Sequence, residues 1–435
     1  MPSTHIVPNL QTTLTGPLLE LERHLLDHQS QIESWFRQQF RATPAPFYAS
    51  VDLRNAGYKL APVDTNLFPA GFNNLAPELR PLAVQAAQAA VTQACPVADG
   101  VLIIPENHTR NTFYLENVRA LQHILCAAGY ETRIGSLLPD LTEPMTLDLP
   151  SGETLTLEPL VRKGDRVGVG DFFPCAVLLN NDLSSGRPEI LEGIEQTLLP
   201  PLDMGWVSRY KTHHFEHYTR VAAEFAALID IDPWIITPRS VQCGPVDFKK
   251  REGLECLAGA VNSVLEETAR AYAEHGVEDT PFAVVKSDRG TYGMAIMSVR
   301  DPEEILSLNK KQRNKMSSGK EGLVAHQMMV QEGVYTFETL NGAVAEPVVY
   351  MIGARVVGGF YRVHTGKSAT DNLNAPGMHF EPLSFAEACA LPDHQADPDA
   401  APNRFYAYGV VARLALVAAA REICETKPEC AGAAE

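Results

Sequence analysis

The segment VVKSDRGTYGMAI, residues 284–296, predicts two strands joined by a glycine turn. Lys286 lies on the first strand, and Gly290 and Gly293 lie in the turn. A glycine turn lets backbone N–H groups approach an anion closely, and a lysine beside it supplies a positive charge for a phosphate. The spacing matches neither a GxxxxGKS loop nor a GxGxxG turn before a helix. The pattern favours a phosphate site, and a plain hairpin with a solvated lysine is the alternative.

Three segments downstream of this hairpin extend the pattern. MVQEGV (329–334) is an apolar strand that runs into polar and small residues. It could form a hinge against an adenine ring or be an ordinary strand end. EPVVYMIGARVVGGFYRVH (346–364) predicts two more strands, and DNLNAPG (371–377) predicts a loop. The order of the four segments is more informative than any one of them.

In this order the segments resemble the ATP-grasp superfamily, and most closely its glutathione-synthetase-like ligases, over about residues 245–385. The resemblance implies that Lys286, Arg362 and Asn372 are catalytic and face the phosphates of ATP and the reacting carboxylate. It also implies a flexible glycine lid, backbone contacts to adenine and a second ATP-contacting lysine upstream. The ATP contacts implied in this way, besides Lys286, are Lys249 or Lys250, Gly290, Thr291, Tyr292, Gly293, Gln331, Glu332, Val334, Glu346 and Asn374.

The magnesium ligands of that superfamily are not in their usual place, because only TKPECAGAAE (426–435) follows the last expected helix. The segment SVDLRNAGYKLAPVDTNLFPAG (50–71) offers Asp52, Asp64 and Asn66 as the matching metal ligands. Asp64 and Asn66 share one face of a strand, and oxygen ligands suit Mg²⁺. We therefore expect a circularly permuted ATP-grasp fold, with these strands and a helix at 14–41 moved to the N-terminus. A substrate loop or a plain hairpin is the alternative.

Strand and helix patterns alternate between residues 80 and 240. This βαβ order predicts a parallel sheet. The expected fold class is therefore α/β (α+β), an ATP-grasp fold with a Rossmann-like parallel domain. The expected parts are the metal-site hairpin at 1–78, the substrate domain at 79–245, a first ATP-grasp part with the glycine loop at 246–330, and a second at 331–435.

Polar segments follow two of the apolar strands, where open parallel sheets place their ligands. In ENHTRN (106–111), His108, Arg110 and Asn111 could bind the carboxylate and amine of an amino acid. In NNDLSSG (180–186), Asp182 could bind an α-amino group. Helix capping and turn formation are the alternatives for these residues.

Four basic residues are candidates for contacts to a substrate carboxylate or phosphate. Arg54 and Lys59 flank the expected metal hairpin, and Arg209 and Lys211 begin the segment SRYKTHHFEHY (208–218). Basic residues mostly lie at the solvated surface, which is the alternative for all four.

The same segment contains a histidine pair. His213 and His217 are one helical turn apart, as in a zinc pair. The sequence shows no HExxH motif and no matching third ligand, so it argues against zinc.

A narrower resemblance covers most of residues 47–377. It rests on DLRNAGYKLAPVDTNLFPAGFNNL (52–75), IPENHTRNTFYLENV (104–118), LNNDLSSG (179–186) and SRYKTHHFEHYTRVA (208–222). These segments resemble the proteobacterial glutamate–cysteine ligase family. That resemblance implies ATP-dependent joining of glutamate to cysteine through an acyl phosphate, with Mg²⁺, as the first step of glutathione synthesis. Glutathione synthetase, another ATP-grasp amino-acid ligase and a non-catalytic nucleotide-binding regulatory protein are the alternatives.

The composition of the chain limits the kinds of binding partner it is expected to have. The chain has 36 Lys and Arg against 53 Asp and Glu, a net charge of −17, which disfavours nucleic acid. None of its eight cysteines forms a CxxC pair, and no apolar run is long enough for a membrane span. We therefore expect a soluble cytoplasmic protein with reduced thiols and small-molecule substrates. The sequence does not indicate an oligomeric state.

Overall fold

The computed structural model describes residues 10–11, 17–290, 295–317, 326–383 and 404–426. The expected hairpin is formed by β13 (Ala283–Ser287) and β14 (Ile296–Val299), with Lys286 opposite Ile296. These strands belong to a four-stranded antiparallel sheet in the order β12–β15–β13–β14, completed by β12 (Ser240–Val246) and β15 (His326–Glu332).

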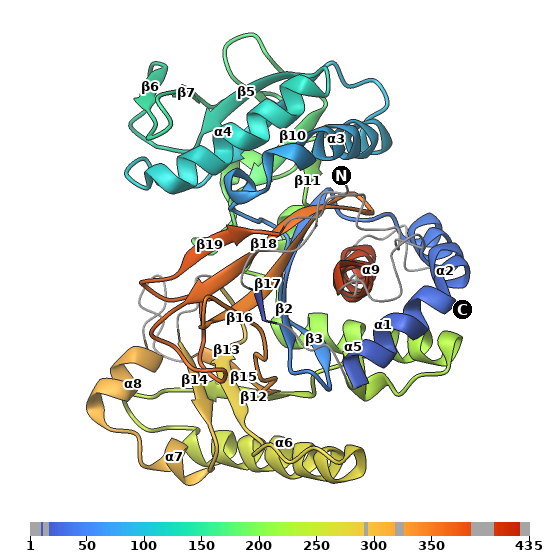
Figure 1. Cartoon of the computed structure of the whole chain (residues 1–435). Helices are drawn as coiled ribbons and strands as arrows, with labels where there is room; N and C mark the ends of the chain where they lie inside the picture. Colours follow the sequence, from blue (N-terminus) through green and yellow to red (C-terminus); the bar gives the residue numbers. More distant parts are fainter. Residues whose placement is uncertain (1–9, 12–16, 291–294, 318–325, 384–403, 427–435) are drawn as a thin grey trace.

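One long helix covers this four-stranded sheet. α6 (Leu254–His275) packs against β12, β13 and β15. The short helix α7 (Glu303–Leu306) contacts α6, and α8 (Lys310–Met316) lies farther from it, on the side of β14 (Figure 1). Apolar residues of α6 recur three and four positions apart, so one face of the helix is buried. The buried residues of that stripe are Leu254, Leu257, Ala258, Val261 and Val264.

A larger sheet of seven strands lies beside the first (Figure 1). Its centre is the antiparallel hairpin of β17 (Ala343–Ile352) and β18 (Arg355–His364). The N-terminal hairpin joins this sheet because β2 pairs with β17, placing Asp52 opposite Val348. The remaining strands are β1 (Leu10–Gln11), β2 (Tyr48–Asn55), β3 (Leu60–Asn66), β16 (Thr339–Leu340) and β19 (His379–Pro382).

The last helix, α9 (Arg404–Glu425), is enclosed by other elements (Figure 1). It packs against β2, β3 and β17 of the large sheet and against three helices, α1 (Pro17–Asp27), α2 (Gln29–Ala42) and α5 (Lys211–Ile229). A helix that is apolar on all sides must be buried, and nearly all of α9 is. Its buried cation Arg413 pairs with Glu33 of α2 at 2.7 Å.

Residues 80–199 form a six-stranded sheet in the order β11–β10–β4–β5–β7–β6. All neighbours are parallel except β6 and β7, which confirms the expected parallel sheet. Helices α3 (Arg80–Ala94) and α4 (Thr112–Ala127) belong to this part of the molecule (Figure 1). Its strands are β4 (Gly100–Pro105), β5 (Glu131–Ser136), β6 (Met145–Asp148), β7 (Thr154–Pro159), β10 (Ala176–Asn180) and β11 (Thr197–Leu199), with a separate hairpin of β8 (Val161–Lys163) and β9 (Arg166–Gly168).

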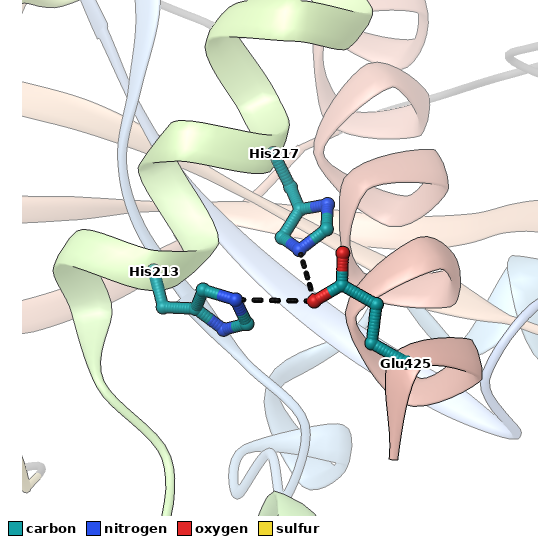
Figure 2. A group of neighbouring side chains, drawn as sticks. All are labelled: His213, His217 and Glu425. Atoms are coloured by element: carbon teal, nitrogen blue, oxygen red, sulfur yellow. Dashed lines mark ion pairs between the residues drawn. The ribbon is translucent and has the colours of Figure 1, made fainter. Parts of the chain in front are cut away.

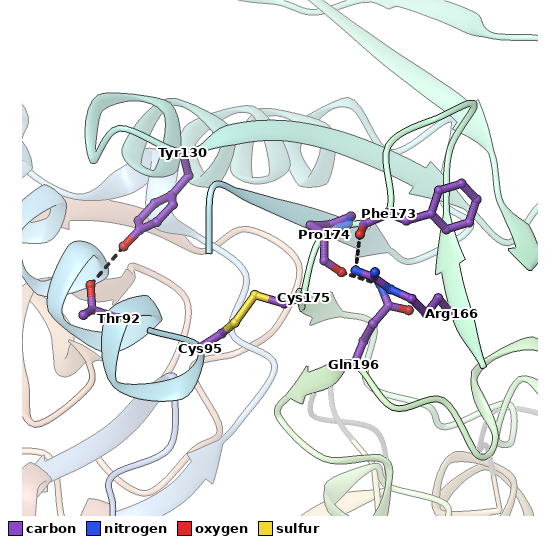
Figure 3. The surroundings of a disulfide bond; sticks show 8 residues. All are labelled: Thr92, Cys95, Tyr130, Arg166, Phe173, Pro174, Cys175 and Gln196. Atoms are coloured by element: carbon purple, nitrogen blue, oxygen red, sulfur yellow. Dashed lines mark hydrogen bonds between the residues drawn. A yellow bond between two sulfur atoms is a disulfide. The ribbon is translucent and has the colours of Figure 1, made fainter. Parts of the chain in front are cut away.

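The structure corrects the expectation about thiols. Cys95 and Cys175 form a disulfide that joins the end of α3 to the start of β10 (Figure 3), and Cys424 is also disulfide-bonded. The prediction of reduced thiols is therefore wrong for these residues. Cys95 and Cys175 are 80 residues apart, so their pairing depends on the packing of α3 against the sheet and leaves no local signal in the sequence.

None of the helices in the described part of the chain combines the length and the apolar character that crossing a membrane would require.

Candidate functional site

A cavity of about 750 Å³ lies where the four-stranded, seven-stranded and six-stranded sheets meet. Its walls come from β2, β3, β13, β15, β17 and β18, and from the polar segments that follow β4 and β10. A volume of this size suits a small-molecule or cofactor site.

Lys286 points into this cavity from β13, with only 5% of its surface exposed. Its Nζ donates to the carbonyl oxygen of Val63 at 2.6 Å and to Oε1 of Gln331 at 2.9 Å. Burial lowers the pKa of Lys286 to about 8, although the negative charge of Asp64 opposes the shift. The contact with Val63 joins the lysine strand to the N-terminal hairpin, more than two hundred residues away in sequence.

Asp64 lies beside this contact on β3. Its Oδ1 accepts a hydrogen bond at 2.6 Å from Nζ of Lys211, the first residue of α5. Burial raises the pKa of Asp64, but the charges of Lys211 and Lys286 outweigh it and lower the value to about 2. About a third of the Asp64 side chain is exposed, and Asn66 lines the cavity next to it. An ionised carboxylate and an amide oxygen on one strand fit the ligand chemistry of Mg²⁺.

A buried network of charges lies on the neighbouring strands. Glu346 of β17 stands opposite Arg362 of β18, and their side chains pair at 2.6 Å. Arg362 also pairs with Asp52 at 2.8 Å, and Arg54 pairs with the second oxygen of Glu346 at 3.1 Å. Burial raises the pKa of Asp52, against the pull of Arg362. Arg54, Arg362 and Glu346 are buried and Asp52 is partly exposed, so two guanidinium groups and two carboxylates pair with one another at this wall of the cavity.

Most of the residues expected from the sequence line this one cavity, and the structure brings them together from widely separated segments of the chain. They are Asp52, Arg54, Asp64, Asn66, Asn111, Asp182, Lys211, Lys286, Gly290, Gln331, Glu332, Val334, Glu346, Arg362, Asn372 and Asn374.

Two expected basic contacts lie behind the cavity wall instead. Lys59 is buried and pairs with Glu332 at 2.6 Å, and it lies over the ring of Trp234. Arg209 is buried against Glu422 at 2.8 Å and donates to the carbonyl oxygen of Thr65. Both cations therefore support neighbouring strands and do not line the cavity.

Four other candidates lie outside the cavity lining. Lys249 and Lys250 follow Asp247, whose carboxylate accepts from both of their backbone N–H groups, and the Lys250 side chain is 63% exposed. His108 and Arg110 lie in a shallow surface depression formed by residues 107–111. Thr291, Tyr292 and Gly293 lie outside the described residues.

Several aromatic and amide side chains that line the cavity were not among the residues expected from the sequence. Tyr350 and Phe360 share a face with Glu346 and Arg362, respectively, because side chains alternate along a strand. That two-residue period was a usable signal. Phe113, which is 77% exposed, lies within IPENHTRNTFYLENV (104–118), but no pattern in that segment marks it as a cavity residue.

Comparisons with known proteins bear on the family of this chain. A sequence model described as glutamate-cysteine ligase (GshA) matches residues 22–423. The chain is also similar to a solved structure from Methylobacillus flagellatus KT that is provisionally named a gamma-glutamylcysteine synthetase. That match has 60% identity and a TM-score of 0.89, and it covers 97% of this chain and 100% of the other.

Other comparisons add little. A glutathione synthetase-like effector from Globodera pallida matches with 9% identity and a TM-score of 0.37, over 84% of this chain and 81% of its own, and carries no argument. No curated protein matches the chain. The family model, which spans nearly the whole chain, confirms the resemblance seen in the sequence: the chain belongs to the glutamate-cysteine ligase family.

Proposed function

We propose that this ligase joins the side-chain carboxylate of glutamate to the amine of cysteine with the use of ATP. The γ-phosphoryl group passes to a carboxylate oxygen of glutamate, giving an acyl phosphate and ADP. The cysteine amine then attacks the acyl carbon and loses a proton. Inorganic phosphate leaves and carries away the carboxylate oxygen to which the phosphoryl group was attached. Catalysis of this kind needs positioning and charge stabilisation more than covalent help from the protein.

The observation that carries the proposal is the meeting of Lys286 with the N-terminal hairpin at the cavity. Lys286 is held by the Val63 carbonyl, next to Asp64, so a phosphate that reaches the lysine also reaches the candidate metal ligands. We assign Lys286 and Arg362 to the transferring phosphoryl group and Asn372 to the phosphates or the reacting carboxylate. Gln331, Glu332, Val334, Glu346 and Asn374 are assigned to the rest of ATP.

Asp52, Asp64 and Asn66 would hold Mg²⁺ in this assignment. The ion would neutralise charge on the phosphates of ATP. Lys211 keeps Asp64 ionised by its direct contact. Arg362 orients Asp52 from the opposite side. The carboxylates are thus held in place by cations of the chain itself.

We also propose that the ATP-grasp fold is circularly permuted. In support, β2 and β3 come from the N-terminus yet extend the sheet formed by β17 and β18. Asp52 and Asp64 are opposite one another across this added hairpin and both line the cavity. We further propose that the parallel sheet belongs to a Rossmann-like domain at 79–245.

The substrate end of the cavity carries amides and carboxylates from the parallel sheet. Asn111 caps α4, and Asp182 follows β10, where Glu106 accepts its backbone N–H. Carboxylates and amide oxygens at this position suit the amino group of an amino acid. We therefore assign the substrate amino acids to this end and the nucleotide to the end near Lys286.

The direct test measures ADP release from ATP and Mg²⁺ with glutamate alone, cysteine alone and both, and identifies the product by mass. We expect release to require both and to yield γ-glutamylcysteine. Release with a different pair would keep a ligase and reject these substrates. ATP binding without release in any mixture would indicate a regulatory nucleotide-binding protein.

The activity should depend on the charge of Lys286. Because the pKa of Lys286 is about 8 in the free protein, kcat/KM for ATP should fall above that pH, by up to about tenfold per pH unit. The profile of Lys286→Arg should stay flat over the same range, since a guanidinium remains charged. If kcat/KM falls in the same way in Lys286→Arg, the pH dependence belongs to another group. Lys59 is one such group, since burial also lowers its pKa to about 8.

Asp64→Asn should weaken the use of magnesium. The substitution removes the charge of a proposed ligand, so the Mg²⁺ concentration for half-maximal activity should rise at least about tenfold, the least that losing even an outer-shell partner costs. Titration of activity with Mg²⁺ at fixed total ATP measures the change. Asp171→Asn, at a fully exposed position, is the control. An unchanged Mg²⁺ requirement in Asp64→Asn would place the metal elsewhere.

A further inference from the structure

Three side chains outside the cavity come together where α5 meets the end of α9 (Figure 2). His213 and His217 lie one turn apart on α5, and Glu425 is the last residue of α9. Oε2 of Glu425 lies 3.2 Å from Nε2 of His213 and 3.2 Å from Nε2 of His217. None of the three belongs to the cavity lining.

We propose that His213, His217 and Glu425 form a zinc site that fastens α9 to α5. Two imidazole nitrogens and one carboxylate oxygen are a ligand set that Zn²⁺ uses, with a water completing four-coordination. The sequence supplied the histidine pair but no third ligand. Glu425 supplies this ligand from a position more than two hundred residues away. The contact between α5 and α9 therefore removes the argument against zinc.

The geometry of the three atoms is close to that of a tetrahedral site. At zinc–ligand distances of roughly 2.1 Å, two ligands of a tetrahedral ion are about 3.4 Å apart. Both nitrogen–oxygen distances of 3.2 Å are already close to this value. All three ligand atoms lie within 4.8 Å of one another, so small side-chain rotations would bring the two nitrogens into range.

The surroundings favour metal binding. His217 is only 3% exposed, so its imidazole ring is held in place with Nε2 beside the Glu425 carboxylate. One guanidinium nitrogen of Arg220 lies 3.5 Å from Nδ1 of His217. Arg220 is exposed and can turn away when Nε2 binds an ion. His213 and Glu425 are about half exposed, which gives an ion a path from solvent.

The position of the site gives it a consequence for the enzyme. Lys211, two residues before His213 at the start of α5, contacts Asp64 at the cavity, and Glu422, one turn before Glu425, pairs with Arg209. A zinc ion would therefore hold the end of α9 against the turn of α5 that follows Lys211. It would stabilise the folded chain, because an ion that binds only the folded state raises its stability.

The test uses the full chain, freed of metal by chelation and kept in excess Mg²⁺ so that the oxygen-rich cavity is filled. Co²⁺ reports coordination number by visible absorption, and competition with Zn²⁺ gives the zinc affinity. We expect one ion per chain with tetrahedral absorption. Glu425→Gln and His213→Ala should weaken binding at least about 10–100-fold, the cost of losing even an outer-shell partner. Zinc should raise the unfolding temperature of the unmodified chain and not that of Glu425→Gln.

His275→Ala is the matched control. His275 pairs with Asp232 at 3.0 Å, but this is a two-residue contact with one histidine, so the substitution should leave zinc binding unchanged. Equal zinc binding by the unmodified chain and Glu425→Gln would overturn the proposal. Sulfur-to-cobalt charge-transfer absorption that survives in Glu425→Gln would do the same, and would assign the ion to the neighbouring thiols of Cys243 and Cys256, 3.6 Å apart.

Discussion

Lys286→Ala is expected to lower turnover by about 10²–10³-fold, the usual effect of removing one preorganised donor to a charged transition state. Lys286 is nearly buried, and its ammonium is held by Val63 and Gln331 at the cavity wall. No rearrangement is needed to present this charge to a phosphate. Alanine would leave the phosphoryl group without that charge.

Turnover in this experiment is ADP release at saturating ATP, Mg²⁺, glutamate and cysteine, with ATP affinity measured separately. Saturation matters because it separates a loss in the chemical step from a loss in nucleotide binding. Lys163→Ala is the control, since Lys163 is 62% exposed on β8, away from the cavity. Turnover of Lys286→Ala within a few-fold of the unmodified enzyme would remove Lys286 from the active site.

The parts of the site that could be predicted from sequence are those encoded locally. The hairpin around Lys286 follows from apolar residues on either side of glycines, and it forms as expected. Asp64 and Asn66 share a cavity wall because strand residues alternate, another local rule. The family resemblance added the order of the segments, which led to one cavity.

The parts that could not be predicted depend on which distant segments meet. Lys59 and Arg209 resemble ligand-binding cations in sequence, and only packing shows that each is already paired, with Glu332 and Glu422. A buried cation needs a partner, but its position in the sequence does not name that partner. The disulfide of Cys95 is unpredictable for the same reason.

The contact between α5 and α9 should be the most sensitive point for stability. The carboxylate of Glu422 accepts from Arg209 at 2.8 and 3.0 Å, and it lies 3.1 Å from Nδ1 of His214. All three side chains are buried. Burial raises the pKa of Glu422, but Arg209 and His214 outweigh it and hold the pKa below its usual range. The stabilisation is therefore present above the ordinary carboxylate pKa and is lost only as the pH falls towards the lower folded-state value.

Glu422→Gln should lower the free energy of unfolding by about 3–5 kcal/mol at neutral pH, because the charge of Arg209 would stay buried without a counter-ion. The midpoint of urea unfolding measures the loss. Glu224→Gln is a matched control, since Glu224 of α5 also pairs with α9, through Arg421 at 2.6 Å, but on the exposed surface. That pair should contribute less than about 1 kcal/mol. Equal effects of the two substitutions would mean that burial does not set the strength of the α5–α9 contact.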